Sequence, residues 1–145
     1  MRLSSPAFAD GAMIPSEYTC DGQDQVPPFV IEDVPVGTAS FAMICHDPDS
    51  PSGNWDHWVA YDIPANTREI NSEVGYQGMN SWNKTGYGGP CPGTGTHHYV
   101  FTLYALDTML NLMGGAPRST LASMMQGHIL AEATVTGKYI KMENR

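Results

Sequence analysis

Apolar residues fall in short runs along the chain, and five of these runs predict β-strands. Ser40–His46 is an almost continuous apolar run, which is typical of a central strand buried on both faces. Pro64 follows a second run and predicts its end, because proline cannot donate to a sheet ladder. The expected strands are Phe29–Ile31, Ser40–His46, His57–Ile63, His97–Leu106 and Thr134–Lys141.

Alternation along two of these runs predicts which side chains share a face. Strand side chains alternate between the two faces of a sheet. In the fourth run both faces are largely apolar, so this strand should also be central. The face that carries His97 should also carry Tyr99, Phe101, Leu103 and Ala105. The same period of two places His57 and Tyr61 on one face of their strand.

Two helices are expected near the C-terminus. Thr108–Met113 predicts a short one. Ser119 has the side chain of a helix N-cap, and a longer helix should run from there to about Glu132. Its buried side would consist of Leu121, Met124, Met125, His128, Ile129 and Leu130.

Turn-forming residues fill most of the remaining sequence. Residues 1–30 hold many Pro, Gly and Asp residues and predict short strands and surface loops. Residues 71–96 form a long glycine-rich loop, of a kind that is usually functional or ordered by its own contacts. The chain has 145 residues, 15 of them Gly and 11 Pro, and only 15% are charged. We therefore expect a single domain over residues 1–145, mainly β and sandwich-like.

Charge and hydropathy exclude several classes of function. The formal net charge of −8 disfavours nucleic-acid binding, which requires Lys and Arg against phosphates. A bound anion would have to be held by local donors rather than by the overall field. No apolar run approaches the roughly 20 residues that span a bilayer, and the N-terminus lacks the apolar core of a signal peptide. These features predict a cytoplasmic protein without a transmembrane segment.

The three cysteines fit neither a zinc motif nor a disulfide-rich scaffold. Cys45 lies in an apolar run and should be a buried thiol. Cys20 and Cys91 both lie in turn-rich segments, so a bridge between them and a pair of free thiols both remain open.

Three segments carry unusual chemistry, although each alone also fits a structural role. His46–Pro51 follows a buried strand and contains two aspartates and two prolines, which also suit a rigid turn with self-capping side chains. Asp56–Trp58 opens a strand with a histidine, which is more often structural than a ligand. Gly86–His97 is rich in glycines that let backbone N–H groups approach an anion. It matches neither a P-loop nor a dinucleotide fingerprint, because it enters a strand rather than a helix.

Taken in order, these segments resemble the phosphatidylethanolamine-binding protein (PEBP) family, in particular its bacterial branch of Raf kinase inhibitor-like proteins. The resemblance rests on Asp47-Pro48-Asp49-Ser50-Pro51, His57-Trp58, Gly89-Pro90 and Gly95-Thr96-His97-His98-Tyr99. It extends from Ser5-Pro6-Ala7-Phe8 to Gly137-Lys138-Tyr139. The connection from Pro51 to His57 is short, as in bacterial members, so inhibition of a Raf kinase is not implied.

The resemblance implies a PEBP-like β-sandwich with a central antiparallel sheet, a smaller sheet and short C-terminal helices. It implies a non-enzymatic, regulatory protein with a pocket for phosphate, a phosphorylated head group or a similar anion, and no cofactor or metal. It also implies a cis peptide bond at Ser50–Pro51. By motif position, the ligand-binding residues are Asp47, Asp49, His57, Gly89, His97 and Tyr99.

Within such a pocket the residue types suggest roles. Asp47 would orient a histidine and raise its proton affinity, because a carboxylate is a poor direct ligand for an anion. His57 and His97 would donate to the anion, one or both protonated, with help from the Tyr99 hydroxyl and N–H groups near Gly89. Cys91 departs from the family pattern at the rim and could alter the pocket's shape or its redox sensitivity.

Other functions remain open from the sequence. One is a His/Asp hydrolase or phosphatase, although no clear nucleophile is visible. A second is a metal site made of His46, Asp47, His57 and His97, without any helix-spaced ligand pair. A third is an interaction or inhibitor module that regulates a kinase or protease. A homodimer is a further option, with the apolar cluster Met109, Leu110, Leu112 and Met113 as one candidate surface.

Overall fold

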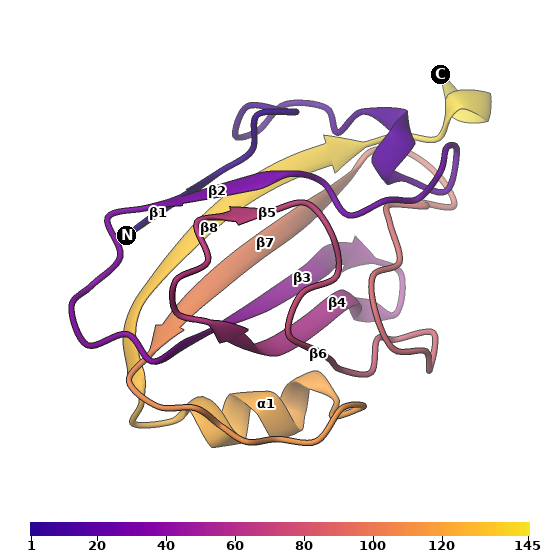
Figure 1. The fold of residues 1–145 in the computed structure, drawn as a ribbon. Coiled ribbons are helices and arrows are strands. Elements are labelled where there is room, and N and C mark those ends of the chain that lie inside the picture. The colour runs from indigo at the N-terminus through magenta and orange to yellow at the C-terminus, as the bar shows by residue number, and fades with distance from the viewer.

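The centre of the structure is an antiparallel sheet of five strands. A computed structural model describes all 145 residues. The strand order is β6-β4-β3-β7-β8, so β3, β4 and β7 are internal (Figure 1). Their bounds are β3 Ser40–Ser50, β4 Gly53–Pro64, β6 Tyr76–Gln77, β7 His97–Leu106 and β8 Ile129–Tyr139.

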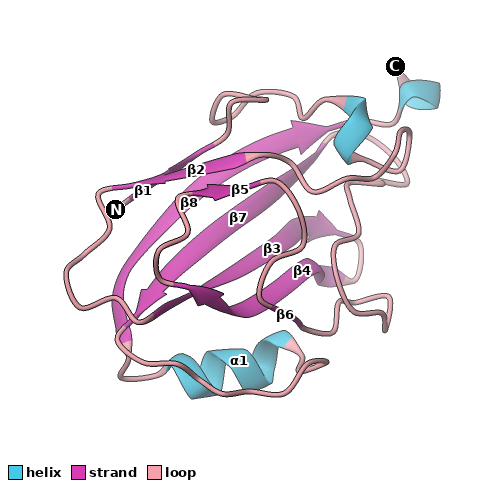
Figure 2. Cartoon of the chain, in the orientation of Figure 1, coloured by secondary structure: helices cyan, strands magenta, loops and turns pink.

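A smaller sheet covers one face of the large one. It consists of β1 (Arg2–Ser4), β2 (Phe29–Glu32) and β5 (Glu69–Ile70), all antiparallel. The helix α1 (Arg118–Met125) lies below the large sheet in Figure 2, away from the small sheet. Two short 3-10 turns complete the elements, η1 at Ser16–Tyr18 and η2 at Met142–Asn144. The predicted mainly β, two-sheet fold is confirmed.

Both faces of the large sheet are buried, as the apolar runs predicted. The main core lies between the sheets, where Phe29 and Ile31 of β2 meet the side chains of β3, β4 and β7. The opposite face packs under α1 and the loop that precedes it. That second core consists of Ala42, Ile44, Val59, Tyr61, Leu106, Leu110, Ala116, Leu121 and Met125.

The predicted alternation of β7 is confirmed. Its bounds are those expected, and the side chains from His97 to Ala105 at alternate positions are all buried. The partners of β7 are β3 on one side and β8 on the other. Tyr99, Phe101 and Leu103 therefore point into the main core, and His97 lies at the end of the same row.

The predicted common face of His57 and Tyr61 is wrong, because β4 contains a bulge. Cys45 of β3 pairs with Trp58 and the next residue, His46, pairs with Asp56, so His57 is an extra residue on β4. A bulge turns side chains out of the regular alternation. The His57 ring packs against Tyr99 on the main-core side, whereas Tyr61 belongs to the core under α1.

The hairpin formed by β3 and β4 extends further than predicted. Both strands continue past the expected ends, and Ser50 pairs with Gly53 across the turn at Pro51 and Ser52. Asp47 and Asp49 thus lie on a strand rather than in a turn that follows it. The expected cis bond at Ser50–Pro51 is wrong, because the chain contains no cis peptide bond.

The predicted helix at Thr108–Met113 is wrong, because a buried carboxylate competes for its backbone. Asp62 is 6% exposed and accepts hydrogen bonds from the N–H groups of Leu110 at 2.7 Å and Leu112 at 3.2 Å. Asn111 between them has a left-handed φ of 52°, which interrupts a helix. The segment is an ordered loop.

The predicted second helix is too long. It runs from Arg118 to Met125 instead of Ser119 to Glu132, and of its predicted buried residues only Leu121 and Met125 are buried. Gly127, with φ of +80°, allows the left-handed turn that ends the helix. The residues after it begin β8, which pairs with β7 along its whole length.

One disulfide bridge joins two loops. Cys20 and Cys91 are bonded, with their Cα atoms 5.5 Å apart, so of the two options left open the bridge is the one observed. Cys45 is a free thiol and fully buried, as predicted. The bridge connects the N-terminal loops to the glycine-rich loop before β7.

The apolar cluster proposed as a dimer surface is divided between core and surface. Leu110 is buried and Leu112 packs against the second core. Met109 and Met113 are exposed.

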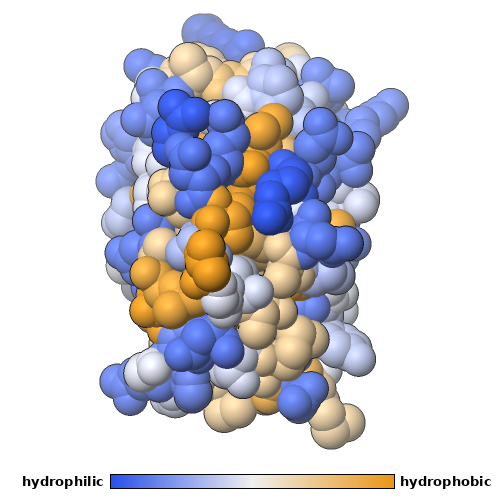
Figure 3. Space-filling view, turned by 60° about the vertical axis from the view of Figure 1, so that its left-hand side comes forward, coloured by the Kyte–Doolittle hydropathy of each residue, from blue (hydrophilic) through white to orange (hydrophobic).

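Other exposed apolar side chains lie on the side of the molecule at the left of Figure 1, where the loop after β2 and the start of β8 meet (Figure 3). Val36, Ile129 and Leu130 are the exposed large apolar residues of these two segments. No helix is long and apolar enough to cross a membrane.

Asp62 offers a test of what holds the loop after β7. The substitution Asp62→Ala leaves two N–H groups without an acceptor, and we expect a loss of about 3 kcal/mol in the free energy of unfolding. Asp33→Ala is the matched control. Asp33 has a positive φ of 55° and Asp62 has a positive φ too, but Asp33 is exposed. Urea unfolding gives the free energy of unfolding of both variants, and the difference between their losses is the part due to the missing carboxylate acceptor rather than to backbone strain. Equal losses in the two variants would contradict the role of the carboxylate.

Candidate functional site

A cavity of about 320 Å³ opens where the β3–β4 hairpin ends and β7 begins. Its walls come from the hairpin, from Trp82 and the segment Cys91–Gly93 in the long loop, and from the first residue of β7. Asp47, His57 and His97 all line it, so the structure brings these three predicted residues together. We call it the histidine pocket. The other lining residues are Ser50, Pro51, Ser52, Trp55, Trp82, Cys91, Pro92 and Gly93.

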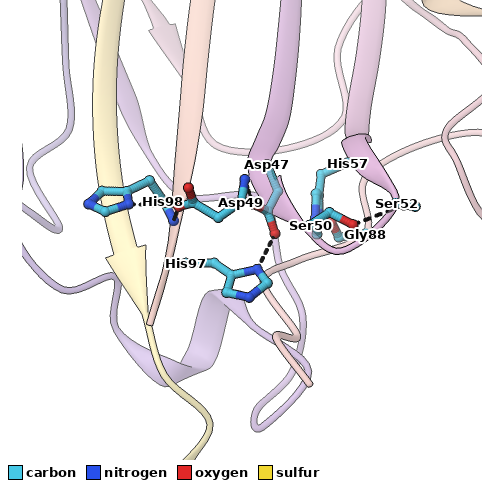
Figure 4. Close-up of polar contacts among 8 residues, drawn as sticks. All are labelled: Asp47, Asp49, Ser50, Ser52, His57, Gly88, His97 and His98. Atoms are coloured by element: carbon cyan, nitrogen blue, oxygen red, sulfur yellow. Dashed lines mark hydrogen bonds and ion pairs between the residues drawn. The ribbon is translucent and has the colours of Figure 1, made fainter. Parts of the chain in front are cut away.

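A buried hydrogen bond joins Asp47 to His97. The Nδ1 of His97 lies 2.6 Å from Oδ2 of Asp47, and their side chains are 11% and 5% exposed (Figure 4). The second carboxylate oxygen of Asp47 accepts the N–H of Asp49 at 2.7 Å. Both oxygens of Asp47 are therefore engaged within the protein. This geometry matches the predicted role of Asp47 as the residue that orients a histidine.

His57 is held in place by the long loop. Its Nδ1 lies 2.7 Å from the carbonyl oxygen of Gly88, and the N–H of Gly88 donates to the carbonyl of His57 at 2.9 Å. Its ring meets the rings of Trp82 and Tyr99 edge-on, with centroids 4.8 and 5.1 Å away. Burial lowers the pKa of His57 below its usual 6.5, against the opposing effects of the Gly88 carbonyl and of Asp47.

Two buried polar atoms at this site have no partner in the protein. They are the indole Nε1 of Trp55 and the hydroxyl of Tyr99. Burial and the nearby Asp47 carboxylate raise the pKa of Tyr99, so its hydroxyl keeps its proton. Buried donors are nearly always hydrogen-bonded in folded proteins. Both atoms are sealed from solvent, and Tyr99, although predicted as a ligand-binding residue, lies behind His57 and does not line the pocket.

Asp49 belongs to a separate, exposed pair. Its Oδ2 accepts hydrogen bonds from the backbone N–H and from Nδ1 of His98, both at 2.8 Å. These hydrogen bonds hold the pKa of Asp49 below its ordinary value. Although Asp49 was predicted as a ligand-binding residue, its carboxylate is directed to His98 and does not line the pocket.

Gly89 also lies outside the histidine pocket. Its N–H donates to Oδ1 of Asp24 at 2.9 Å, which occupies the donor that the sequence assigned to an anion. A Cβ at this position would lie 2.4 Å from the Tyr18 carbonyl oxygen. The side chain of residue 89 must therefore be absent so that the loop can approach the N-terminal segment.

A second hollow of about 450 Å³ lies on the other side of Trp82. Trp82 and Cys91 line both hollows, and Gly89, Asp24 and Lys84 line only this one. It contains no histidine. The histidine pocket is the better candidate, because it combines two histidines with a buried carboxylate.

The sequence reasoning did not identify Trp55, Trp82 or the carbonyl of Gly88. Trp55 had a detectable signal, since it lies two residues before His57 on the same strand. Trp82 and Gly88 had none, because their positions depend on how the long loop folds back over β4.

The metal site considered from the sequence is not assembled. No group of three or more His, Cys, Asp or Glu side chains is placed to hold a metal ion. His46 lies opposite Asp56 in the register of β3 and β4, and it lies near Arg118. Burial and the Arg118 charge lower the pKa of His46. It therefore faces α1, on the opposite side of β3 from Asp47.

The fold and the site define a class: two-sheet antiparallel β domains with a histidine–aspartate pocket at the end of the central hairpin. The family described as phosphatidylethanolamine-binding protein matches residues 4–140. The chain belongs to this family.

Relatives and solved structures agree with this assignment. A UPF0098 protein of Methanothermobacter thermautotrophicus is 43% identical over 96% of this chain and 98% of its own length. One from Aquifex aeolicus is 45% identical over 96% of this chain and 88% of its length. The crystal structure of a PEBP homolog from Chlamydia trachomatis has a TM-score of 0.93 at 36% identity, with 97% of each chain covered. E. coli YbcL, described as a member of the mammalian PEBP family, gives 0.87 at 28% identity over 97% of this chain and 98% of YbcL.

The two glycines Gly89 and Gly93 test the packing of the pocket loop. Gly89→Ala should cost more than about 2 kcal/mol of stability, because its Cβ meets backbone and the Asp24 carboxylate. Gly93→Ala, four residues further on, has open space around its Cβ and should change stability by less than about 0.5 kcal/mol. Chemical unfolding gives both values, and similar costs would show that the close approach at Gly89 is not required.

His57 should make stability depend on pH. Its pKa is lower in the folded chain than in the unfolded one, so its contribution is complete above about pH 6.5 and declines as the pH falls below that value. In His57→Asn, the amide can still donate to the Gly88 carbonyl but does not titrate. Urea unfolding at pH 8, 6.5 and 5 should show a smaller acid loss in the variant. An equally steep loss in both proteins would contradict the assignment.

Proposed function

We propose that this chain binds small anions, such as phosphate or a phosphorylated head group, in the histidine pocket. The observation that carries the proposal is the buried Asp47–His97 hydrogen bond at the cavity wall. Membership of a family named for phosphatidylethanolamine binding supports it. As an imidazolium, His97 would donate from Nδ1 to Asp47 and from Nε2 to the anion.

The main donor in this proposal is His97. Nδ1 of His97 is used by Asp47, so its Nε2 is the ring nitrogen left for a ligand. The Trp55 indole and the Tyr99 hydroxyl also lack partners, but both are sealed from solvent and would reach a ligand only if the pocket wall shifts. Such local donors are needed because the whole chain carries a net charge of −8.

We further propose that the pocket binds its ligand without turning it over, and that the protein acts as a regulatory binding module. The serine hydroxyls that line the pocket, Ser50 and Ser52, hydrogen-bond each other at 3.0 Å rather than either histidine. Burial raises the pKa of the Cys45 thiol well above its ordinary value, so it stays protonated. Neither arrangement supplies an activated nucleophile.

Calorimetric titration with phosphate at about pH 6.5 tests the proposal. Wild type should bind, and His97→Ala and Asp47→Asn should each bind at least tenfold more weakly, because one loses the donor and the other its orientation. His98→Ala is the matched control, since His98 is the next residue of β7 and pairs with Asp49 outside the pocket. It should bind as wild type does. The same affinity in all four proteins would refute the proposed site, and release of alcohol from a phosphomonoester would refute binding without turnover.

A further inference from the structure

The two histidines of the pocket present different chemistry to a ligand. The Gly88 carbonyl can only accept a hydrogen bond, so Nδ1 of His57 carries a proton. The Nε2 of His57 has no partner in the protein and, unlike the Trp55 and Tyr99 atoms, is not sealed from solvent. Because the ring lines the pocket, this nitrogen opens on the cavity.

The groups around His57 keep its ring neutral. Asp47 on β3 and Asp56 on β4 favour a charged ring, but burial outweighs them and lowers the pKa of His57. The other neighbours are the uncharged aromatic rings of Tyr99 on β7 and Trp82 in the long loop. In a neutral ring whose Nδ1 carries the proton, Nε2 carries a lone pair and can only accept a hydrogen bond. His57 thus accepts a hydrogen bond, whereas the sequence had suggested that it donates one.

We propose that the pocket selects anions that carry their own proton, namely hydrogen phosphate and singly ionised phosphomonoesters, over proton-free anions such as sulfate and phosphodiesters. This inference rests on the proposed anion site and makes His57 its specificity-determining residue. The ligand's P–O–H donates to His57 Nε2, while another of its oxygens accepts from Nε2 of His97. An anion without a proton places an oxygen lone pair against that of Nε2, or forces His57 to take up a proton.

The expected discrimination is large because His57 offers a proton-free anion an acceptor in place of a donor. A site built to hydrogen-bond a ligand hydroxyl rejects analogues that lack it far more strongly than an apolar pocket rejects a change in size. His57 is 3% exposed and its Nδ1 is held by the Gly88 carbonyl, so the ring cannot turn to offer its donor instead. We expect phosphate to bind at least tenfold more tightly than sulfate at about pH 7, where both phosphate species carry at least one proton.

Competitive calorimetry with four probes tests the inference: phosphate, methyl phosphate, sulfate and dimethyl phosphate. The titrations are made at about pH 6, because a phosphomonoester loses its second proton near that pH. Phosphate and methyl phosphate should bind there, and the other two should bind at least tenfold more weakly. Dimethyl phosphate stands for the diester of an intact lipid head group and methyl phosphate for a free monoester. If no probe binds, the proposed function itself fails. If sulfate and phosphate bind within threefold of each other, the anion site stands and the selectivity is refuted.

His57→Gln identifies the responsible residue. Its amide can either donate or accept, so the preference for phosphate over sulfate should shrink towards unity. A preference that persists in this variant would overturn the role of His57. Wild type provides a second measurement that needs no variant: below about pH 6 sulfate affinity should rise, with proton uptake seen as a dependence of the binding heat on the buffer. Sulfate binding without proton uptake would refute the inference.

Discussion

Burial of both faces of β3, β4 and β7 is the constraint on which the rest of the structure depends. The small sheet covers one face and α1 with its preceding loop covers the other. A polar side chain buried on these strands has no access to water and must find a partner nearby. Asp62 meets this requirement by binding the loop after β7, and Asp47 meets it by binding His97. The same requirement thus shapes both the fold and the site.

The bulge in β4 connects this packing to the pocket. A regular strand would direct His57 towards α1, with Val59 and Tyr61. The extra residue instead turns His57 onto the side of Tyr99, where the Gly88 carbonyl fixes its tautomer. The long loop can reach His57 only because Gly88 and Gly89 lack side chains. Trp82 lies over the first, and Tyr18 and Asp24 crowd the second. The disulfide between Cys20 and Cys91 joins the long loop to the N-terminal segment that contains Tyr18 and Asp24.

The sequence predicted the features that depend on local periodicity. The bounds and faces of β7 follow from its alternation, and Asp47, His57 and His97 were named correctly as pocket-lining residues from ordered motifs that resemble the family. Features decided by distant contacts were missed. The helix expected at Thr108–Met113 is replaced by a loop because Asp62, far away in sequence, binds its N–H groups. The N–H of Gly89, expected to donate to an anion, instead donates to the carboxylate of Asp24, which is also distant in sequence.

The pocket's electrostatics differ from those of the chain as a whole. With a net charge of −8, the protein repels anions at long range, so the proposed anion binding would depend on groups within hydrogen-bond distance. Both oxygens of Asp47 are used inside the protein, which keeps its charge close to His97 rather than directed at a ligand. What remains for the proposed ligand is Nε2 of His97 and the Nε2 lone pair of His57. In the proposed site the position of single protons, rather than the sum of charges, would decide which anion fits.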